Sequence, residues 1–153
     1  MSVPKYKRTI IGENDNSAFT NMNTFITLGD LNQNGRLDVI ISGRDGNMIW
    51  LENPGNPITS WEQHMIDCIE KLECGGTTID LTRNGYADII CGGDWRSDNV
   101  YWWENPGKEN TPWRRHIITQ TGFTQFHDEI IGDITNDGRI SLLFNNQGNG
   151  SLN

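Results

Sequence analysis

One segment of this chain occurs three times at a spacing of about 50 residues, and this repetition limits the possible folds more than any other feature. The first copy is GDLNQNGRLDVII at residues 29–41, the second is IDLTRNGYADIIC at 79–91, and the third is GDITNDGRISLLF at 132–144. A second motif recurs in register with the first, as IWLENPG at 49–55 and YWWENPG at 101–107. The chain is therefore built from repeated units that need their neighbours for burial.

Each unit contains four short segments that are rich in β-branched and aromatic residues and are separated by Gly, Asn, Asp or Pro. This pattern is typical of β-strands joined by turns, with no helix. In the second unit we expect strands at about 77–81, 87–92, 100–104 and 113–119. A unit of four antiparallel strands repeated at this period predicts an all-β fold of β-propeller blades, with three repeats in this chain.

We expect the chain to be a single propeller segment over residues 1–153. Its parts would be a lone outer strand at 5–11, a first blade at 24–68, a second blade at 74–120 and an incomplete third blade at 126–153. Propellers usually have about 4 to 8 blades, so three predict a partial ring or a ring completed by oligomerisation. The expected protein partners are further copies of this chain or the remaining blades of a longer propeller, because open blade edges invite pairing.

Charge and composition narrow the classes of partner. The chain has 12 Lys and Arg against 20 Asp and Glu, giving a formal net charge of -8. This excess of negative charge argues against nucleic acid as a partner and favours cations. No apolar run approaches the ~20 residues of a membrane-spanning helix, so membrane insertion is not expected. Cys68, Cys74 and Cys91 form an odd set without the spacing of a metal motif, so no disulfide framework is expected.

An Asp-rich loop lies between the first two strands of each unit. Calcium takes six to eight oxygen ligands, and alternate residues of a tight loop around a glycine can supply them. The second loop has Thr82 at its third position and the third ends in Ser141, so calcium affinity should fall along the series. Alternatively, the loops are Asx turns whose side chains cap backbone amides. The expected calcium ligands are Asp30, Asn32, Asn34, Arg36 and Asp38; Asp80, Thr82, Asn84, Tyr86 and Asp88; and Asp133, Thr135, Asp137 and Arg139.

The loop DLNQNGRLD at 30–38, followed by WLENPG at 50–55, resembles the FG-GAP/VCBS-type repeats of integrin-like propellers. The resemblance covers almost the whole chain and implies that calcium has a structural role. It also implies an extracellular or periplasmic location, although the basic N-terminus has no apolar segment typical of a signal peptide. Propellers of this kind serve as adhesion receptors, lectin-like modules and lyases, so the resemblance does not define an activity.

Neighbouring strands alternate in direction, so the turns between second and third strands gather with the connections between blades on the face opposite the Asp-rich loops. On that face Trp95 stands beside charged groups, an arrangement that suits a sugar stacked on the indole. We therefore expect a noncatalytic module that binds carbohydrate or a protein partner. Alternatively, Trp95 packs on the adjacent blade and Arg96 pairs with Asp94 or Asp98. The expected ligand-binding residues are Arg44, Asp45, Asp94, Trp95, Arg96, Asp98 and His127.

A second hypothesis is a polysaccharide lyase or hydrolase, or part of one, that acts on acidic glycans. His127 would be the general base, and Arg44 or Arg96 would neutralise a uronate carboxylate. The candidate catalytic residues are His127, Asp128, Arg44 and Arg96. In the competing interpretation, His127 hydrogen-bonds an adjacent loop. A third hypothesis is a structural assembly in which blade pairing between chains is itself the function.

Overall fold

The computed structural model describes residues 5–16, 22–56, 59–147 and 151–152, and these residues form strands and loops without a helix. Three antiparallel sheets follow one another along the chain, each with its strands in sequence order. The all-β prediction and the division into antiparallel blades are confirmed. The strands are β1(Asn23–Gly29), β2(Asp38–Gly43), β3(Asp45–Glu52) and β4(Glu62–Glu70); β5(Thr77–Ile79), β6(Asp88–Gly92), β7(Asn99–Glu104) and β8(Arg114–Gln120); and β9(Phe126–Gly132), β10(Ser141–Asn146) and β11(Ser151–Leu152).

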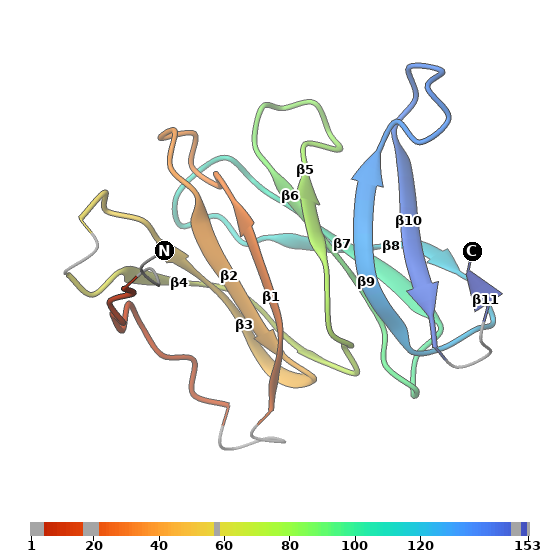
Figure 1. Cartoon of the computed structure of the whole chain (residues 1–153), viewed down its shortest axis with the longest axis horizontal. Helices are drawn as coiled ribbons and strands as arrows, with labels where there is room; N and C mark the ends of the chain where they lie inside the picture. Colours follow the sequence, from red (N-terminus) through yellow and green to blue (C-terminus); the bar gives the residue numbers. More distant parts are fainter. Residues whose placement is uncertain (1–4, 17–21, 57–58, 148–150, 153) are drawn as a thin grey trace.

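The three sheets stand side by side in an open row, with the first strand of each nearest the centre of the row (Figure 1). β1 contacts β5, and β5 contacts β9, so the inner strands of neighbouring sheets pack together. The row does not close on itself, as expected for three blades. The described part of the chain contains no helix that could cross a bilayer.

Equivalent residues of the first two blades make equivalent contacts. The ring of Trp50 stacks on His64 with centroids 4.3 Å apart, and Trp102 stacks on His116 at 4.2 Å. Nε2 of His64 lies 3.1 Å from Glu52, and Nε2 of His116 lies 2.9 Å from Glu104. These histidines therefore connect the outer strand of each of the two blades to the adjacent strand of the same blade.

The main core lies between the first and second blades. Its largest fully buried side chain is that of Trp103, whose indole N–H donates a 2.9 Å hydrogen bond to Asp67 Oδ2. A smaller core of Ile90, Val100 and Phe126 joins the second blade to the third. Each blade thus buries its apolar side chains against a neighbour, which explains why the repeat is the unit of folding.

The expected outer strand at residues 5–11 does not form in this structure. The Ile11 carbonyl instead accepts a hydrogen bond from the N–H of Trp61 at 2.8 Å. A strand requires a partner edge, and the free edge of the third blade at β11 lies at the opposite end of the row (Figure 1). Residues 148–150 and 153, which belong to the expected third blade, lie outside the described residues.

Candidate functional site: Asp-rich loops and the opposite face

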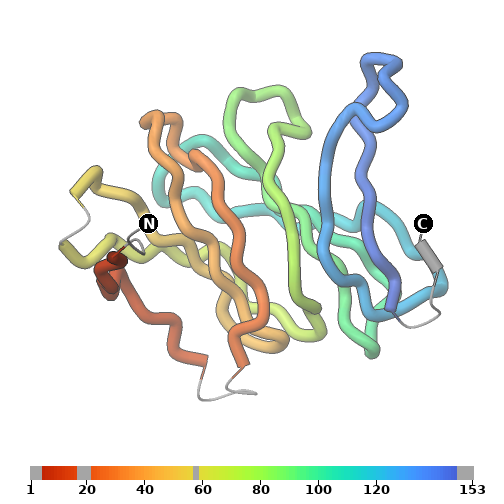
Figure 2. Tube along the Cα trace, viewed as in Figure 1, coloured from red at the N-terminus to blue at the C-terminus, as the bar shows by residue number. Residues whose placement is uncertain are grey.

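The three Asp-rich loops project from the same side of the row, each between the first two strands of its sheet (Figure 2). In the first loop both carboxylate oxygens of Asp30 accept loop amides, Oδ1 from Asn34 at 3.0 Å and Oδ2 from Gly35 at 2.8 Å. Oδ1 of Asn34 accepts the N–H of Arg36 at 2.9 Å. The loop is thus a series of Asx turns that direct side-chain oxygens inward.

The second loop has the same geometry. Asp80 accepts the amides of Asn84 at 3.0 Å and Gly85 at 2.8 Å, and Asn84 accepts the amide of Tyr86 at 2.8 Å. In the third loop, Asp133 accepts the amides of Asp137 at 3.1 Å and Gly138 at 2.9 Å. The Asx-turn interpretation is therefore correct for all three loops. It does not compete with calcium binding, because a carboxylate oxygen has a second lone pair available for a cation.

The last acidic residue of the first two loops is buried at the start of a strand. Asp38 accepts the amides of Leu31 at 3.0 Å and Asn53 at 2.9 Å. Asp88 accepts those of Leu81 at 2.9 Å and Asn105 at 2.8 Å. Burial is the largest cause of a raised pKa at both carboxyls, partly opposed by these hydrogen bonds.

The donor set of the first two loops fits calcium, because two carboxylates, amide or hydroxyl oxygens and a turn carbonyl are the hard ligands that calcium prefers. A nearby cation would also offset the energetic cost of burying the carboxylates of Asp38 and Asp88, because positive charge favours the ionised form. The third loop has Ser141 where the others have a buried aspartate. Its donor set is accordingly poorer.

On the opposite face, the structure brings together residues of the first and second blades that the sequence placed there. Arg96 Nη2 pairs with Asp94 at 2.5 Å and with Asp45 at 2.8 Å. Arg44 Nη2 pairs with Glu73 at 2.5 Å, and its Nε lies 3.9 Å from Asp94. The prediction that Arg96 pairs with Asp94 is confirmed, and the network joins two blades.

Trp95 lies over these ion pairs. Its ring centroid is 4.5 Å from Cζ of Arg44 and 5.0 Å from Cζ of Arg96, within cation–π distance. The side chain nevertheless remains 53% exposed. Asp98 lies on the same turn, where its carbonyl accepts the amide of Thr121 at 3.1 Å. Trp95, Arg44, Arg96, Asp45 and Asp94 are called the Trp95 cluster below.

His127 borders this cluster but its contacts differ from those of a general base. Nδ1 lies 3.1 Å from Cys74 Sγ, and Nε2 lies 3.9 Å from Glu73 Oε2. Asp128 is the extra residue of a β-bulge, with a φ of 55°, and its side chain is exposed. The interpretation in which His127 contacts a neighbouring connection is therefore correct. The sequence placed Glu73 on the same face as His127, but Cys74 was not predicted as part of a site, because it lies 53 residues from His127.

Glu129 is a further buried carboxyl beside His127. It is only 4% exposed, and Oε1 accepts the amide of Gly92 at 2.9 Å. Burial, with smaller contributions from the charges of Asp128 and Glu73, raises the pKa of Glu129 from 4.5 to about 8. The folded protein therefore holds a proton that the unfolded chain releases between these pH values.

The substitution Glu129→Gln is expected to reduce the pH dependence of stability. The neutral carboxyl stabilises the fold fully below about pH 4.5, and this contribution is lost as the pH rises through about 8. The glutamine keeps the acceptor for Gly92 and does not titrate. The melting temperature of the wild type should fall by about 5 to 10 °C more than that of the variant between pH 5 and pH 9. The exposed Glu70→Gln is the control, and equal slopes for wild type and Glu129→Gln would contradict the assignment.

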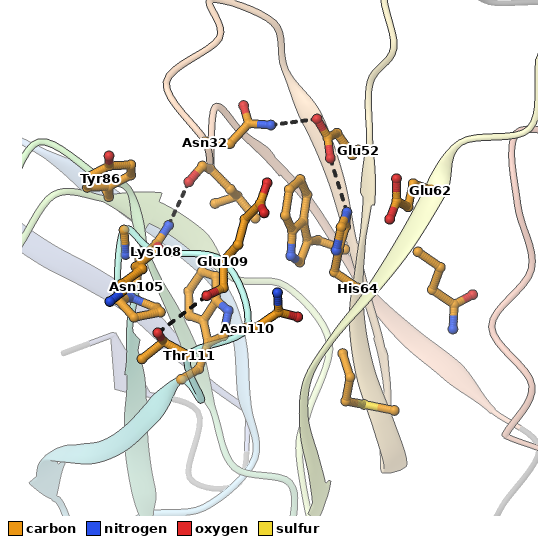
Figure 3. Close-up of a pocket in the computed structure, with 17 residues that line it drawn as sticks. Asn32, Glu52, Glu62, His64, Tyr86, Asn105, Lys108, Glu109, Asn110 and Thr111 are labelled. Atoms are coloured by element: carbon orange, nitrogen blue, oxygen red, sulfur yellow. Dashed lines mark hydrogen bonds and ion pairs between the residues drawn. The ribbon is translucent and has the colours of Figure 1, made fainter.

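A cavity of about 600 Å³ lies between the first two blades on the side of the Asp-rich loops (Figure 3). Glu52 and His64 line one side, and Lys108 and Glu109, from the turn after β7, line the other. Asn32 reaches from the first loop to donate a 2.8 Å hydrogen bond to Glu52. This cavity was not predicted from the sequence, because its walls come from different repeats. The shared ENPG segment was the available signal, since it places both turns on one side.

The repeated antiparallel sheets, each with an Asp-rich loop between its first two strands, are consistent with propeller blades. The family profile of FG-GAP-like repeats matches residues 80–144, which extend from the second Asp-rich loop to strand β10. This part of the chain is similar to an FG-GAP-like repeat, which confirms the resemblance inferred from the loop sequences. A comparison with curated proteins finds no match.

Proposed function

We propose that this chain is a noncatalytic, calcium-stabilised propeller module that binds a carbohydrate through the Trp95 cluster. The observation that carries the proposal is Trp95 itself, a large aromatic ring that is 53% exposed while fixed against two ion-paired arginines. An exposed apolar ring held in one orientation is a platform for a pyranose face. Because the ring is already ordered, stacking costs little conformational entropy.

Calcium would act at a distance from this face. The loops lie at the other ends of the strands that carry the cluster, and an ion in each would hold the first two strands of a blade together. Carboxylates without a cation repel one another, so calcium binding would increase stability by mass action. Its role is structural, and the ligand chemistry belongs to the opposite face.

The charge balance of the cluster favours a neutral sugar. Arg44 and Arg96 are both paired with buried or half-buried carboxylates from Asp45, Glu73 and Asp94. Two guanidinium charges therefore face three carboxylates, and no excess positive charge is left for a uronate. The same arrangement weakens the lyase alternative, which needs a cation for the substrate carboxylate and a ring nitrogen of His127 facing the substrate.

The substitution Trp95→Ala is expected to weaken binding of a neutral oligosaccharide by at least about 10-fold, because the stacking platform is lost. Calorimetric titration with neutral and uronate-containing oligosaccharides provides the measurement. Tyr86→Ala is the control, since Tyr86 lines the cavity at the opposite face. Unchanged affinity in Trp95→Ala, or a loss in Tyr86→Ala alone, would place the ligand elsewhere. Preference for the uronate series would instead support the lyase alternative.

Assembly with further blades is a second candidate role. The observation that favours it is the presence of exposed apolar side chains at both ends of the row. Ile26 and Leu28 on β1 are 66% and 51% exposed, and Ile130 on β9 is 57% exposed. Phe25 and Glu129, which directly precede Ile26 and Ile130, face the second blade. Because successive side chains of a strand point to opposite faces, the exposed apolar side chains face away from the second blade. Apolar faces at both ends fit additional blades, from a second copy or a longer chain, and the molar mass by light scattering distinguishes the two sources.

A further inference from the structure

A cluster of three residues whose side chains could hold a metal ion lies at the edge of the Trp95 cluster. Glu73, Cys74 and His127 each offer one ligand atom within 4.8 Å of the others. Glu73 and Cys74 belong to the connection between the first and second blades, whereas His127 lies on β9 of the third. The three groups are brought together only by the packing of the blades.

The distances within this cluster fit a small tetrahedral ion. Cys74 Sγ lies 3.1 Å from Nδ1 of His127 and 3.3 Å from Oε1 of Glu73. Ligands bound to zinc at about 2.0 to 2.3 Å are separated by roughly 3.3 to 3.7 Å at tetrahedral angles. The two distances from Cys74 Sγ are therefore within a few tenths of an ångström of those in a zinc site, and all three ligand atoms lie within 4.8 Å of one another.

The buried carboxylate of Glu73 gives an independent indication of a missing ligand. Its side chain is completely buried, yet Oε2 has no hydrogen-bond partner among the described residues. This oxygen lies 3.9 Å from Nε2 of His127, which is not the ring nitrogen that contacts Cys74 Sγ. A buried carboxylate oxygen without a partner is costly, and such groups commonly bind a metal ion or an ordered water.

We propose that Glu73, Cys74 and His127 form a zinc site that joins the connection between the first two blades to the third blade. Sulfur, imidazole and carboxylate are the ligands that zinc selects, whereas the Asp-rich loops offer oxygen alone. Three protein ligands leave a fourth position for water. The site is thus chemically distinct from the calcium loops.

Zinc binding at this site displaces a proton from the thiol. Burial, together with the hydrogen bond and the charge of Glu73, raises the pKa of Cys74 to about 11, so the thiol is protonated at neutral pH. A bound divalent cation stabilises the thiolate, and the proton is released to solvent. The positive charge of Arg44, 2.5 Å from Glu73, reduces the net affinity without blocking the sulfur or the imidazole.

Cobalt provides a spectroscopic probe for the site, with calcium present in millimolar excess to occupy the loops. The wild type should bind one equivalent at this cluster with a thiolate charge-transfer band and the strong visible absorption of tetrahedral cobalt, and zinc should displace the cobalt. Cys74→Ser should abolish the thiolate band and weaken binding by at least about 100-fold. His127→Gln should retain the band but weaken binding by about 10-fold or more.

Two control variants separate this site from weak binding elsewhere. Cys68→Ser removes an exposed thiol, and His64→Ala disrupts the other three-residue cluster, formed by Glu52, Glu62 and His64. Both should leave the cobalt spectrum unchanged. The proposal fails if the wild type shows no thiolate band, or if the band persists in Cys74→Ser. It also fails if the band disappears in Cys68→Ser. Circular dichroism of each variant establishes that it is folded.

Discussion

Replacing Gly76 with alanine should lower the free energy of unfolding by about 3 to 5 kcal/mol. Gly76 has a φ of 138°, a conformation that residues with a Cβ rarely adopt. A Cβ at this position would lie 1.9 Å from Cε2 of Phe25 and 2.8 Å from the carbonyl oxygen of Ile90. Phe25 is buried in the core between the first two blades, so the substitution would separate them.

The matched control is Gly122→Ala, which tests backbone strain without a clash. Gly122 also has a positive φ, 73°, but a Cβ there would meet no atom within 4 Å. This variant should lose about 1 kcal/mol. Chemical denaturation monitored by tryptophan fluorescence measures both values. Equal losses in the two variants would contradict close packing between the first and second blades at Gly76.

Replacing Asp38 with alanine should lower the free energy of unfolding by about 2 to 5 kcal/mol even without calcium. The fully buried carboxylate accepts the amides of Leu31 and Asn53, and its removal leaves the buried N–H of Leu31 and the half-buried N–H of Asn53 without an acceptor. The variant should also lose most of the stabilisation that calcium gives to the first loop, because one of its two carboxylates is absent.

Ser141→Ala is the control, since Ser141 occupies the corresponding position of the third loop and is not fully buried. Its loss should remain below about 0.5 kcal/mol, as for an ordinary partly exposed substitution. Thermal unfolding in chelator and in calcium gives both effects for each variant. A similar loss in Asp38→Ala and Ser141→Ala would show that the buried aspartate does not hold the loop.

The repeat made the blade architecture predictable from sequence. Ile40 and Ile90, or Trp50 and Trp102, occupy equivalent positions because strand alternation and turn chemistry act locally within each unit. The lone outer strand at residues 5–11 was not predictable in the same way. Its formation depends on a distant edge, which this chain places at the far end of the row.

The candidate sites were predictable to different degrees. The loop from Asp30 to Asp38 is contiguous, so its geometry follows from local Asx turns. The ion pairs of Arg96 were partly foreseen because Asp94 is two residues away, but the contact with Asp45 depends on blade packing. The cluster of Cys74 with His127 was missed, since its ligands are 53 residues apart and follow no metal motif.

The most direct test of the central claim is a calcium titration of the wild-type chain, stripped of metal, by isothermal calorimetry and thermal unfolding. We predict saturable binding, tightest in the first loop and weaker in the second, with a melting temperature that rises with calcium concentration. Asp38→Ala should abolish the tightest phase. The absence of binding heat and of any thermal shift at millimolar calcium would contradict the account and leave the three loops as Asx turns alone.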